Sequence, residues 1–325
     1  MATSSKVIWW VAGLALGLVA GSVVPGVGPA AEWALTPCLI VLLFLTFLDL
    51  PFEGAVKAFG DLRFLAAVVG ANFLVVPLVV AGLVTVVDLG DLVDFPEPML
   101  LAVLVVLLCP CIDYVIVFTR AVDGRAEKLL ALTPVLMIAQ LLVLPVSIWA
   151  ITGGRLSAAL PVGPLVSALM LFIIIPLLAA IVVRLAARRS GRVQSGVDAA
   201  SSLVDLVMTL TLLVIAASVA PLIGGSMSHL GGVVLVFVVF AVIMVGLGWV
   251  VARWMRLEAG SSRAVVLSAV TRNSLVVLPI VRAATGDGIG PAAVVAQTLV
   301  EVLFLLVLTR FLPKLIPDTA VSENR

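Results

Sequence analysis

The chain has 325 residues, of which 63% are hydrophobic and 11% are charged, and its formal net charge is +1. Apolar runs recur from end to end, which excludes a soluble domain and predicts an all-α protein that crosses a membrane many times. The chain has neither a basic aromatic patch nor a GxxxxGK[ST] loop, so we expect no nucleic-acid partner, no cofactor and no enzyme activity.

Ten apolar windows are long enough to cross a bilayer as helices. They cover residues 7–25, 32–50, 63–87, 97–119, 129–151, 162–186, 202–223, 230–252, 264–284 and 291–312. Sixteen of the 19 Lys and Arg residues fall on one side of this layout, whereas Arg155 and Arg282 fall on the other. Such an excess predicts that both termini are cytoplasmic in a multi-pass protein of the cell (plasma) membrane.

Polar residues interrupt the fourth and ninth windows at mid-depth. The fourth contains Cys109-Pro110-Cys111-Ile112-Asp113, and the ninth contains Thr271-Arg272-Asn273-Ser274. Proline removes a backbone donor, and a charged residue at the bilayer centre costs about 2.5–3.5 kcal/mol, so neither stretch suits a continuous helix. We expect both to be helix breaks that line a cavity, because freed backbone groups must be satisfied by protein or by water.

The two halves of the chain share this pattern. After each break, an apolar half-helix ends in Arg-Ala, a Gly/Asp turn follows, and the next window holds a buried polar residue, Gln140 or Glu301. Five windows per half is an odd number, so the halves 1–157 and 158–325 enter the membrane from opposite sides. Interrupted segments at matching places in inverted halves predict crossing breaks and a substrate site at the midplane.

The cysteines differ in their surroundings. Cys38 lies in an uninterrupted window, where a thiol is usually an apolar filler. Cys111 lies in a break beside a carboxylate, and we place the start of the second half-helix at about this residue. A helix N-terminus and a nearby cation favour the thiolate, which binds soft metals, and Cys109 is a candidate second ligand. The three cysteines lie in apolar windows, which excludes a secreted disulfide framework.

The remaining polar residues suggest a proton carrier and a polar lining. Glu301 has no Lys or Arg within one helical turn, and an isolated buried carboxylate favours its protonated form, so we expect it to carry protons. Asp113 and Arg272 either form a structural ion pair, or Arg272 attracts an anion or stabilises the Cys111 thiolate. Side chains that could hydrogen-bond a hydroxylated substrate are Thr271, Asn273, Ser274 and Gln140.

Several runs resemble the arsenical-resistance-3 arsenite permeases of the bile acid/sodium symporter superfamily. These runs are Cys111–Phe118, Ala121–Gly124, Met137–Gln140 and Leu299–Val302, and Asn72–Leu78 resembles the third helix of the wider superfamily. The resemblance implies an exporter of trivalent arsenic in which Cys111 and Glu301 are essential. It also implies a core of helices 3–5 and 8–10, with helices 4 and 9 crossing, and a panel of helices 1, 2, 6 and 7. The ligands of the sodium-coupled branch are missing from both breaks.

Three functions follow as hypotheses. The first is a secondary active transporter that exports arsenite and antimonite by proton exchange, with Cys111 capturing As(III) and Glu301 carrying the proton. The second is sodium- or proton-coupled uptake of a small organic anion, with Arg272 as the anion site. The third is a sensor or scaffold without transport, which would have no need of two broken helices. In the first two cases the partners are a small-molecule substrate, protons or sodium, and the lipid bilayer; the oligomeric state stays open.

Overall fold

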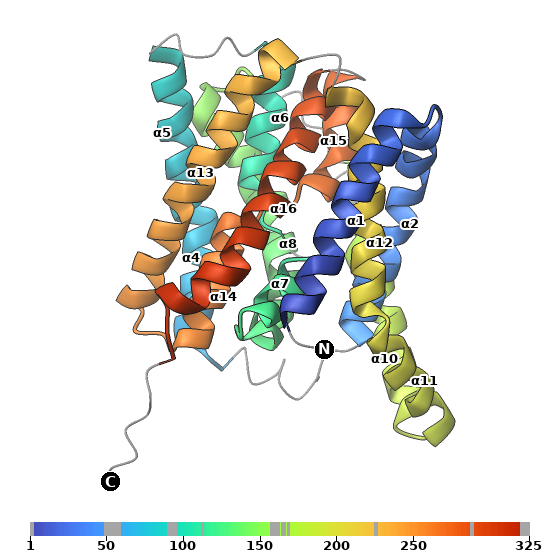
Figure 1. The fold of residues 1–325 in the computed structure, drawn as a ribbon. Coiled ribbons are helices and arrows are strands. Elements are labelled where there is room, and N and C mark those ends of the chain that lie inside the picture. Colours follow the sequence, from blue (N-terminus) through green and yellow to red (C-terminus); the bar gives the residue numbers. More distant parts are fainter. Residues whose placement is uncertain are drawn as a thin grey trace.

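The computed structural model describes residues 3–48, 60–89, 96–111, 114–156, 163, 167, 170–223, 227–286 and 289–318. Every named element in these residues is a helix (Figure 1). The first half contains α1 (Thr3–Val23), α2 (Val27–Leu48), α4 (Leu62–Gly70), η1 (Ala71–Val75), α5 (Val76–Leu89), α6 (Glu97–Leu108), α7 (Val115–Ala121) and α8 (Ala126–Thr152). The second contains η3 (Met170–Ile174), α10 (Ile175–Ala187), α11 (Gly191–Ser202), α12 (Val204–Ile223), α13 (Met227–Trp254), α14 (Ala259–Val270), α15 (Ser274–Thr285) and α16 (Ile289–Leu315).

Each of the ten apolar windows contains helix, so the prediction of an all-α membrane protein is confirmed. Among the described residues, five helices are long and apolar enough to span a membrane, or six if α11 and α12, bent by 43°, form one span. The fourth and ninth windows fall short of this length because they are divided at their breaks, which leaves α6 and α14 with 12 residues each. The ten-span count itself stays a prediction.

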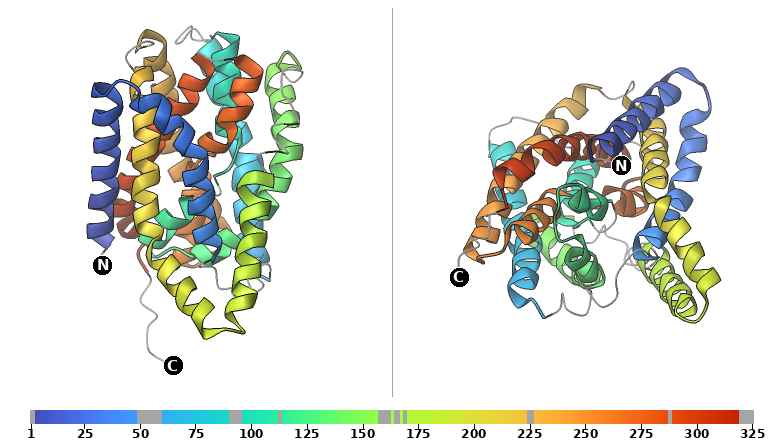
Figure 2. Two further views of the ribbon diagram at one scale, coloured as in Figure 1. Left: turned by 90° about the vertical axis from the view of Figure 1, so that its right-hand side faces the viewer. Right: turned by 60° about the horizontal axis from the view of Figure 1, so that its bottom comes forward.

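The helix α11 was not expected from hydropathy. It carries mostly polar and small residues, and Val197 is its buried side chain. It follows α10 at the end of the molecule where α1 begins and α16 ends (Figures 1 and 2). A short amphipathic helix of this kind is held by packing rather than by an apolar length, so a search for spans does not detect it.

The helices form two groups that lie side by side (Figures 1 and 2). In one group α1 and α2 both pack against α12, and α10 packs against α2. The other group contains α4 to α8 and α13 to α16, with α6 against both α15 and α16, and α13 against α14. The two interrupted helix pairs, α6–α7 and α14–α15, belong to this second group.

A row of glycines sets the spacing inside the first group. A Cβ atom on Gly13, Gly17 or Gly21 would lie 2.7, 2.2 or 2.3 Å from a carbonyl oxygen of α12. These distances are shorter than any real Cβ contact, so α1 and α12 approach closely only because the side chains are absent. The four-residue spacing therefore serves packing within one chain.

Two π-helical turns share a local cause. The turns η1 and η3 each end two residues before a proline, Pro77 and Pro176. Proline has no N–H group, so the carbonyl four residues earlier loses its helical donor, and a wider turn provides another. In η1 this turn carries Asn72, a fully buried amide in an otherwise apolar span.

Candidate substrate and coupling site

The two helix breaks meet in the second group of helices. Pro110 and Arg272 form an antiparallel β-bridge. The Cys111 N–H donates to the Thr271 carbonyl at 3.3 Å, and the Asn273 N–H donates to the Cys109 carbonyl at 2.9 Å. Each break is extended where its helix ends, and each satisfies backbone groups that the other exposes, as buried peptide groups require. The prediction that the breaks meet is confirmed by this bridge.

Cys109 and Cys111 are both buried in the break, and neither thiol is in a disulfide. The expectation that the second half-helix starts near Cys111 is wrong, because α7 begins at Val115. Cys111 instead lies in extended chain whose N–H is bonded to the other break. Arg272 brings a cation close to this break, because its backbone forms the β-bridge with Pro110, the residue between the two cysteines. The argument for a thiolate from a helix terminus therefore does not hold at Cys111, and the argument from a nearby cation stays a prediction.

The Arg272 guanidinium is fully buried and its described hydrogen-bond partners are uncharged oxygens. Its Nη2 donates to Asn72 Oδ1 at 2.8 Å and to the carbonyls of Ser268 and Ala269 at 2.7 and 2.8 Å. Its Nη1 donates to the Leu107 carbonyl at 3.4 Å. Asp113, the partner proposed from the sequence, lies outside the described residues, so the Asp113–Arg272 pair stays a prediction.

Glu301 of α16 is almost fully buried, and its carboxylate lies next to the crossing. Its Oε1 accepts a hydrogen bond from the Tyr114 hydroxyl at 2.6 Å. Its Oε2 accepts from the backbone N–H of Arg272 at 2.7 Å and from the Gln297 amide. The expectation of an isolated carboxylate is therefore wrong: no basic side chain lies next to it in α16, but donors from both breaks reach it. The carboxylate therefore connects Tyr114, which directly follows the first break, with Arg272 in the second break.

The other predicted lining residues are buried but play different parts. The Ser274 hydroxyl accepts from Thr298 Oγ1 at 2.9 Å, which ties the start of α15 to α16. Asn273 contacts the first break through its backbone N–H. The Thr271 hydroxyl donates to the Leu267 carbonyl, one turn earlier in the chain. Gln140 is buried in α8, and its Oε1 has no hydrogen-bond partner among the described residues. Among the described residues, no hydrogen bond joins Gln140 to the crossing.

Sequence reasoning missed three residues that complete this site. Gln297 precedes Glu301 by one helical turn, and that spacing was a signal that could have been used. Asn72 appeared only in a family resemblance, although a lone amide in an apolar span is itself a signal for function. Tyr114, the single tyrosine of the chain, directly follows the first break.

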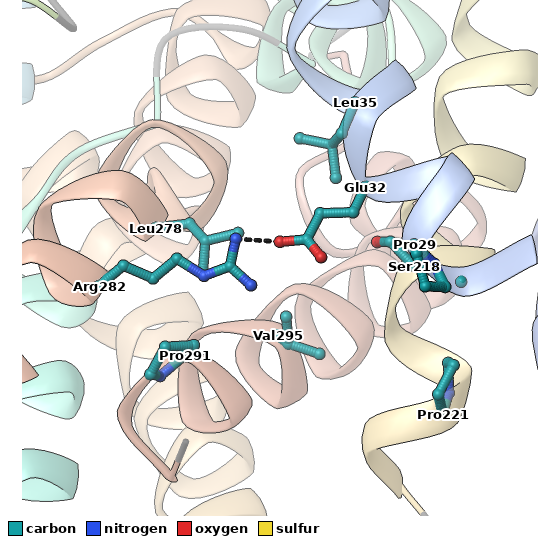
Figure 3. Close-up of a pocket in the computed structure, with 10 residues that line it drawn as sticks. Pro29, Glu32, Leu35, Ser218, Pro221, Leu278, Arg282, Pro291 and Val295 are labelled. Atoms are coloured by element: carbon teal, nitrogen blue, oxygen red, sulfur yellow. Dashed lines mark ion pairs between the residues drawn. The ribbon is translucent and has the colours of Figure 1, made fainter. Parts of the chain in front are cut away.

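A cavity of about 160 Å³ lies between the two groups of helices (Figure 3). Its lining includes Leu278 of α15 and Val295 of α16, which lie about one turn from Ser274 and Thr298. An ion pair between Glu32 of α2 and Arg282 of α15 connects the two groups across it. The residues that line this cavity belong to neither break, so the cavity lies about one helical turn from the crossing, toward the end where α1 joins α2. The expectation that the breaks themselves line a cavity stays a prediction.

Comparison with known proteins gives the family. Residues 36–225, more than half of the chain, match the family described as Sodium Bile acid symporter family. The matched part includes η1 with Asn72 and the whole first break, whereas the second break and Glu301 lie beyond it. No curated protein matches the chain. The extent of the family match shows that the chain belongs to the sodium/bile acid symporter family and is a multi-pass membrane transporter of that type.

Proposed function

We propose that this transporter exports arsenite and antimonite across the plasma membrane in exchange for protons. The observation that carries the proposal is the position of Glu301, whose carboxylate accepts hydrogen bonds from the chain at both breaks. A titratable group that holds together two segments beside buried thiols can couple proton uptake to a change at the substrate site.

Cys111 would capture the substrate. Arsenite is a neutral hydroxide, and a thiol replaces one of its hydroxyl groups to form an As–S bond, releasing water. Water reverses the same step, so attachment through one sulfur permits release on the other side. Cys109 offers a second sulfur, and Asn273, Ser274 and Gln140 offer hydrogen bonds to the remaining hydroxyls. Because the substrate is uncharged, the membrane potential alone cannot expel it, and an exchanged proton provides the driving force.

Glu301 would carry that proton. As a carboxylate it accepts from Tyr114, from Gln297 and from the backbone N–H of Arg272. Protonation turns one acceptor into a donor. Tyr114 can accept such a bond, and Gln297 can turn its amide because its Oε1 has no hydrogen-bond partner in the part of the chain that the structure describes. The Arg272 N–H can only donate, and a protonated, neutral oxygen is a weaker acceptor than a carboxylate, so protonation on Oε2 would weaken the link to the second break. Proton uptake would in this way loosen the contact between the breaks.

We propose ten spans arranged as two inverted five-helix halves, 1–157 and 158–325. In support, α8 and α16 each have 27 residues, and α6 and α14 each have 12. The group of α1, α2, α10 and α12 would be the panel, and the other group the core. The layout places both termini in the cytoplasm. A reporter fused after residue 325 should then be cytoplasmic, and labels in residues 88–97 should react from outside; the opposite pattern would refute the layout.

Transport in proteoliposomes tests the function. The wild-type protein should move arsenite when a pH gradient is imposed, and replacing sodium by choline should change nothing. Cys111→Ser should abolish this transport while leaving the protein folded, and Cys38→Ser should behave as wild type. Full arsenite transport without Cys111 would exclude thiol capture.

The family match favours a second candidate, uptake of an organic anion coupled to sodium or protons. In that case the Arg272 guanidinium would bind the anion. Its Nη2 is already shared by three oxygen acceptors, which leaves little capacity for a carboxylate and is why we place this candidate second. Sodium-driven uptake of a bile acid by the same vesicles, with no arsenite transport, would establish it.

A further inference from the structure

Three backbone carbonyls at the crossing have lost their helical donors. The N–H that would bond the Ser268 carbonyl in a continuous helix belongs to Arg272, and it goes to Glu301 instead. The Ala269 carbonyl loses the N–H of Asn273, which bonds Cys109. The Leu107 carbonyl likewise loses the N–H of the residue four positions on, which bonds the second break. Forming the crossing therefore leaves three oxygens without their usual partners.

The Arg272 side chain provides what these oxygens lack. Its guanidinium donates to all three carbonyls and to Asn72 Oδ1. The carbonyls belong to the last turns of α6 and α14, whose ends both carry partial negative charge, so a cation is favoured there. The Phe240 ring lies 5.7 Å from the guanidinium carbon and adds a further attraction for a cation.

The position of Nη2 has the features of an ion site. Oxygens of Asn72, Ser268 and Ala269 lie 2.7–2.8 Å from this one atom. None of the three oxygens is charged, whereas sites for divalent ions are built with carboxylates, so the set suits a monovalent ion better than a divalent one. Backbone carbonyls at the ends of interrupted helices are common ligands of coupling cations in transporters.

We propose that the Arg272 guanidinium occupies a monovalent-cation site at the crossing, so that the transporter carries its cation on its own chain. The permanent charge stabilises the crossing in every state, and no cation from solution has to bind for it to form. The proposal extends the proposed function by explaining why transport would be indifferent to sodium. It also predicts that removing the guanidinium exposes a site for a free alkali ion.

Thermal unfolding of the purified protein tests this without any transported substrate. Wild type, Arg272→Gln and Arg272→Ala are compared in choline, lithium, sodium and potassium chloride at constant ionic strength. The wild type should unfold at the same temperature in all four salts. Both variants should be less stable in choline and regain about 3 °C or more in at least one alkali salt, with a saturable concentration dependence.

Arg263→Gln is the matched control. Arg263 is also a buried arginine bound to carbonyls, those of Val122 and Ile316, but its guanidinium in addition pairs with the exposed carboxylate of Asp318. This variant should lose stability equally in every salt. The proposal is overturned if alkali ions stabilise the wild type as much as they stabilise the variants. It is also overturned if neither Arg272 variant gains stability from any alkali ion, and the failure to recover folded variant protein in any salt counts as this outcome. An absence of arsenite transport by the wild type would refute the proposed function and leave this result unchanged.

Discussion

Replacing Glu301 separates a coupling role from a structural one. In Glu301→Ala the donors that faced the carboxylate remain buried without an acceptor. An unsatisfied buried donor costs about 1–3 kcal/mol, so the backbone N–H of Arg272 and the Gln297 amide together cost about 2–6 kcal/mol. The Tyr114 hydroxyl adds to this unless it turns to another acceptor.

Glu301→Gln keeps the shape of the side chain and one acceptor. Its oxygen can accept from Arg272 and Gln297, and its amide can donate to the Tyr114 oxygen, because a hydroxyl both donates and accepts. We expect a loss of stability of about 1–2 kcal/mol, the difference between charged and neutral hydrogen bonds. The amide cannot titrate, so arsenite transport driven by a pH gradient should fall to the level of protein-free vesicles.

The assay pairs thermal unfolding with transport in proteoliposomes, and binding of arsenite is followed separately. Glu301→Gln should be folded, should bind arsenite and should not exchange it for protons. Tyr114→Phe is the control, because it removes one donor but retains the carboxylate, and it should retain transport that depends on the pH gradient. If Glu301→Gln transports arsenite as the wild type does, Glu301 is not the proton carrier. If it is as unstable as Glu301→Ala, the role of the residue is structural.

Two further predictions concern stability. Gly17→Ala should destabilise the protein by about 1–3 kcal/mol, because the new Cβ would lie 2.2 Å from the Leu213 carbonyl oxygen. Gly82→Ala is the control and should not destabilise the protein, because nothing lies within 4 Å of its new Cβ. Equal unfolding temperatures for the two variants would contradict the packing of α1 on α12. The Lys128 ammonium, 2.7 Å from Asp61, and the Phe64 N–H hold the pKa of Asp61 below its usual range, so this contact contributes stability above about pH 4 that is lost as the pH falls through the lowered pKa. Asp61→Asn should therefore show a weaker fall in unfolding temperature between about pH 5 and pH 2 than the wild type, and identical acid profiles would refute this contribution.

The sequence by itself determined the class of the protein and the places where its helices are interrupted. Hydropathy over about 20 residues is a local property, and it located helix in all ten windows. Proline at residue 110 and the polar run at 271–274 are local too, because they remove backbone donors or place polar groups where lipid cannot satisfy them. The four-residue spacing of Gly13, Gly17 and Gly21 is also a local property, which permits a close helix contact without indicating which helix provides it.

Only the tertiary structure decided what the interrupted segments bind. Tyr114 and Glu301 are 187 residues apart in sequence, and Arg272 and Asn72 are 200 apart, yet each pair shares a hydrogen bond. No periodicity predicts such pairs, because they depend on which helix ends meet and which carbonyls lose their donors. For the same reason, the prediction from sequence treated Glu301 as isolated and placed the start of α7 four residues too early. The charges of the site were visible in the sequence, but their partners were fixed by the packing of distant helices.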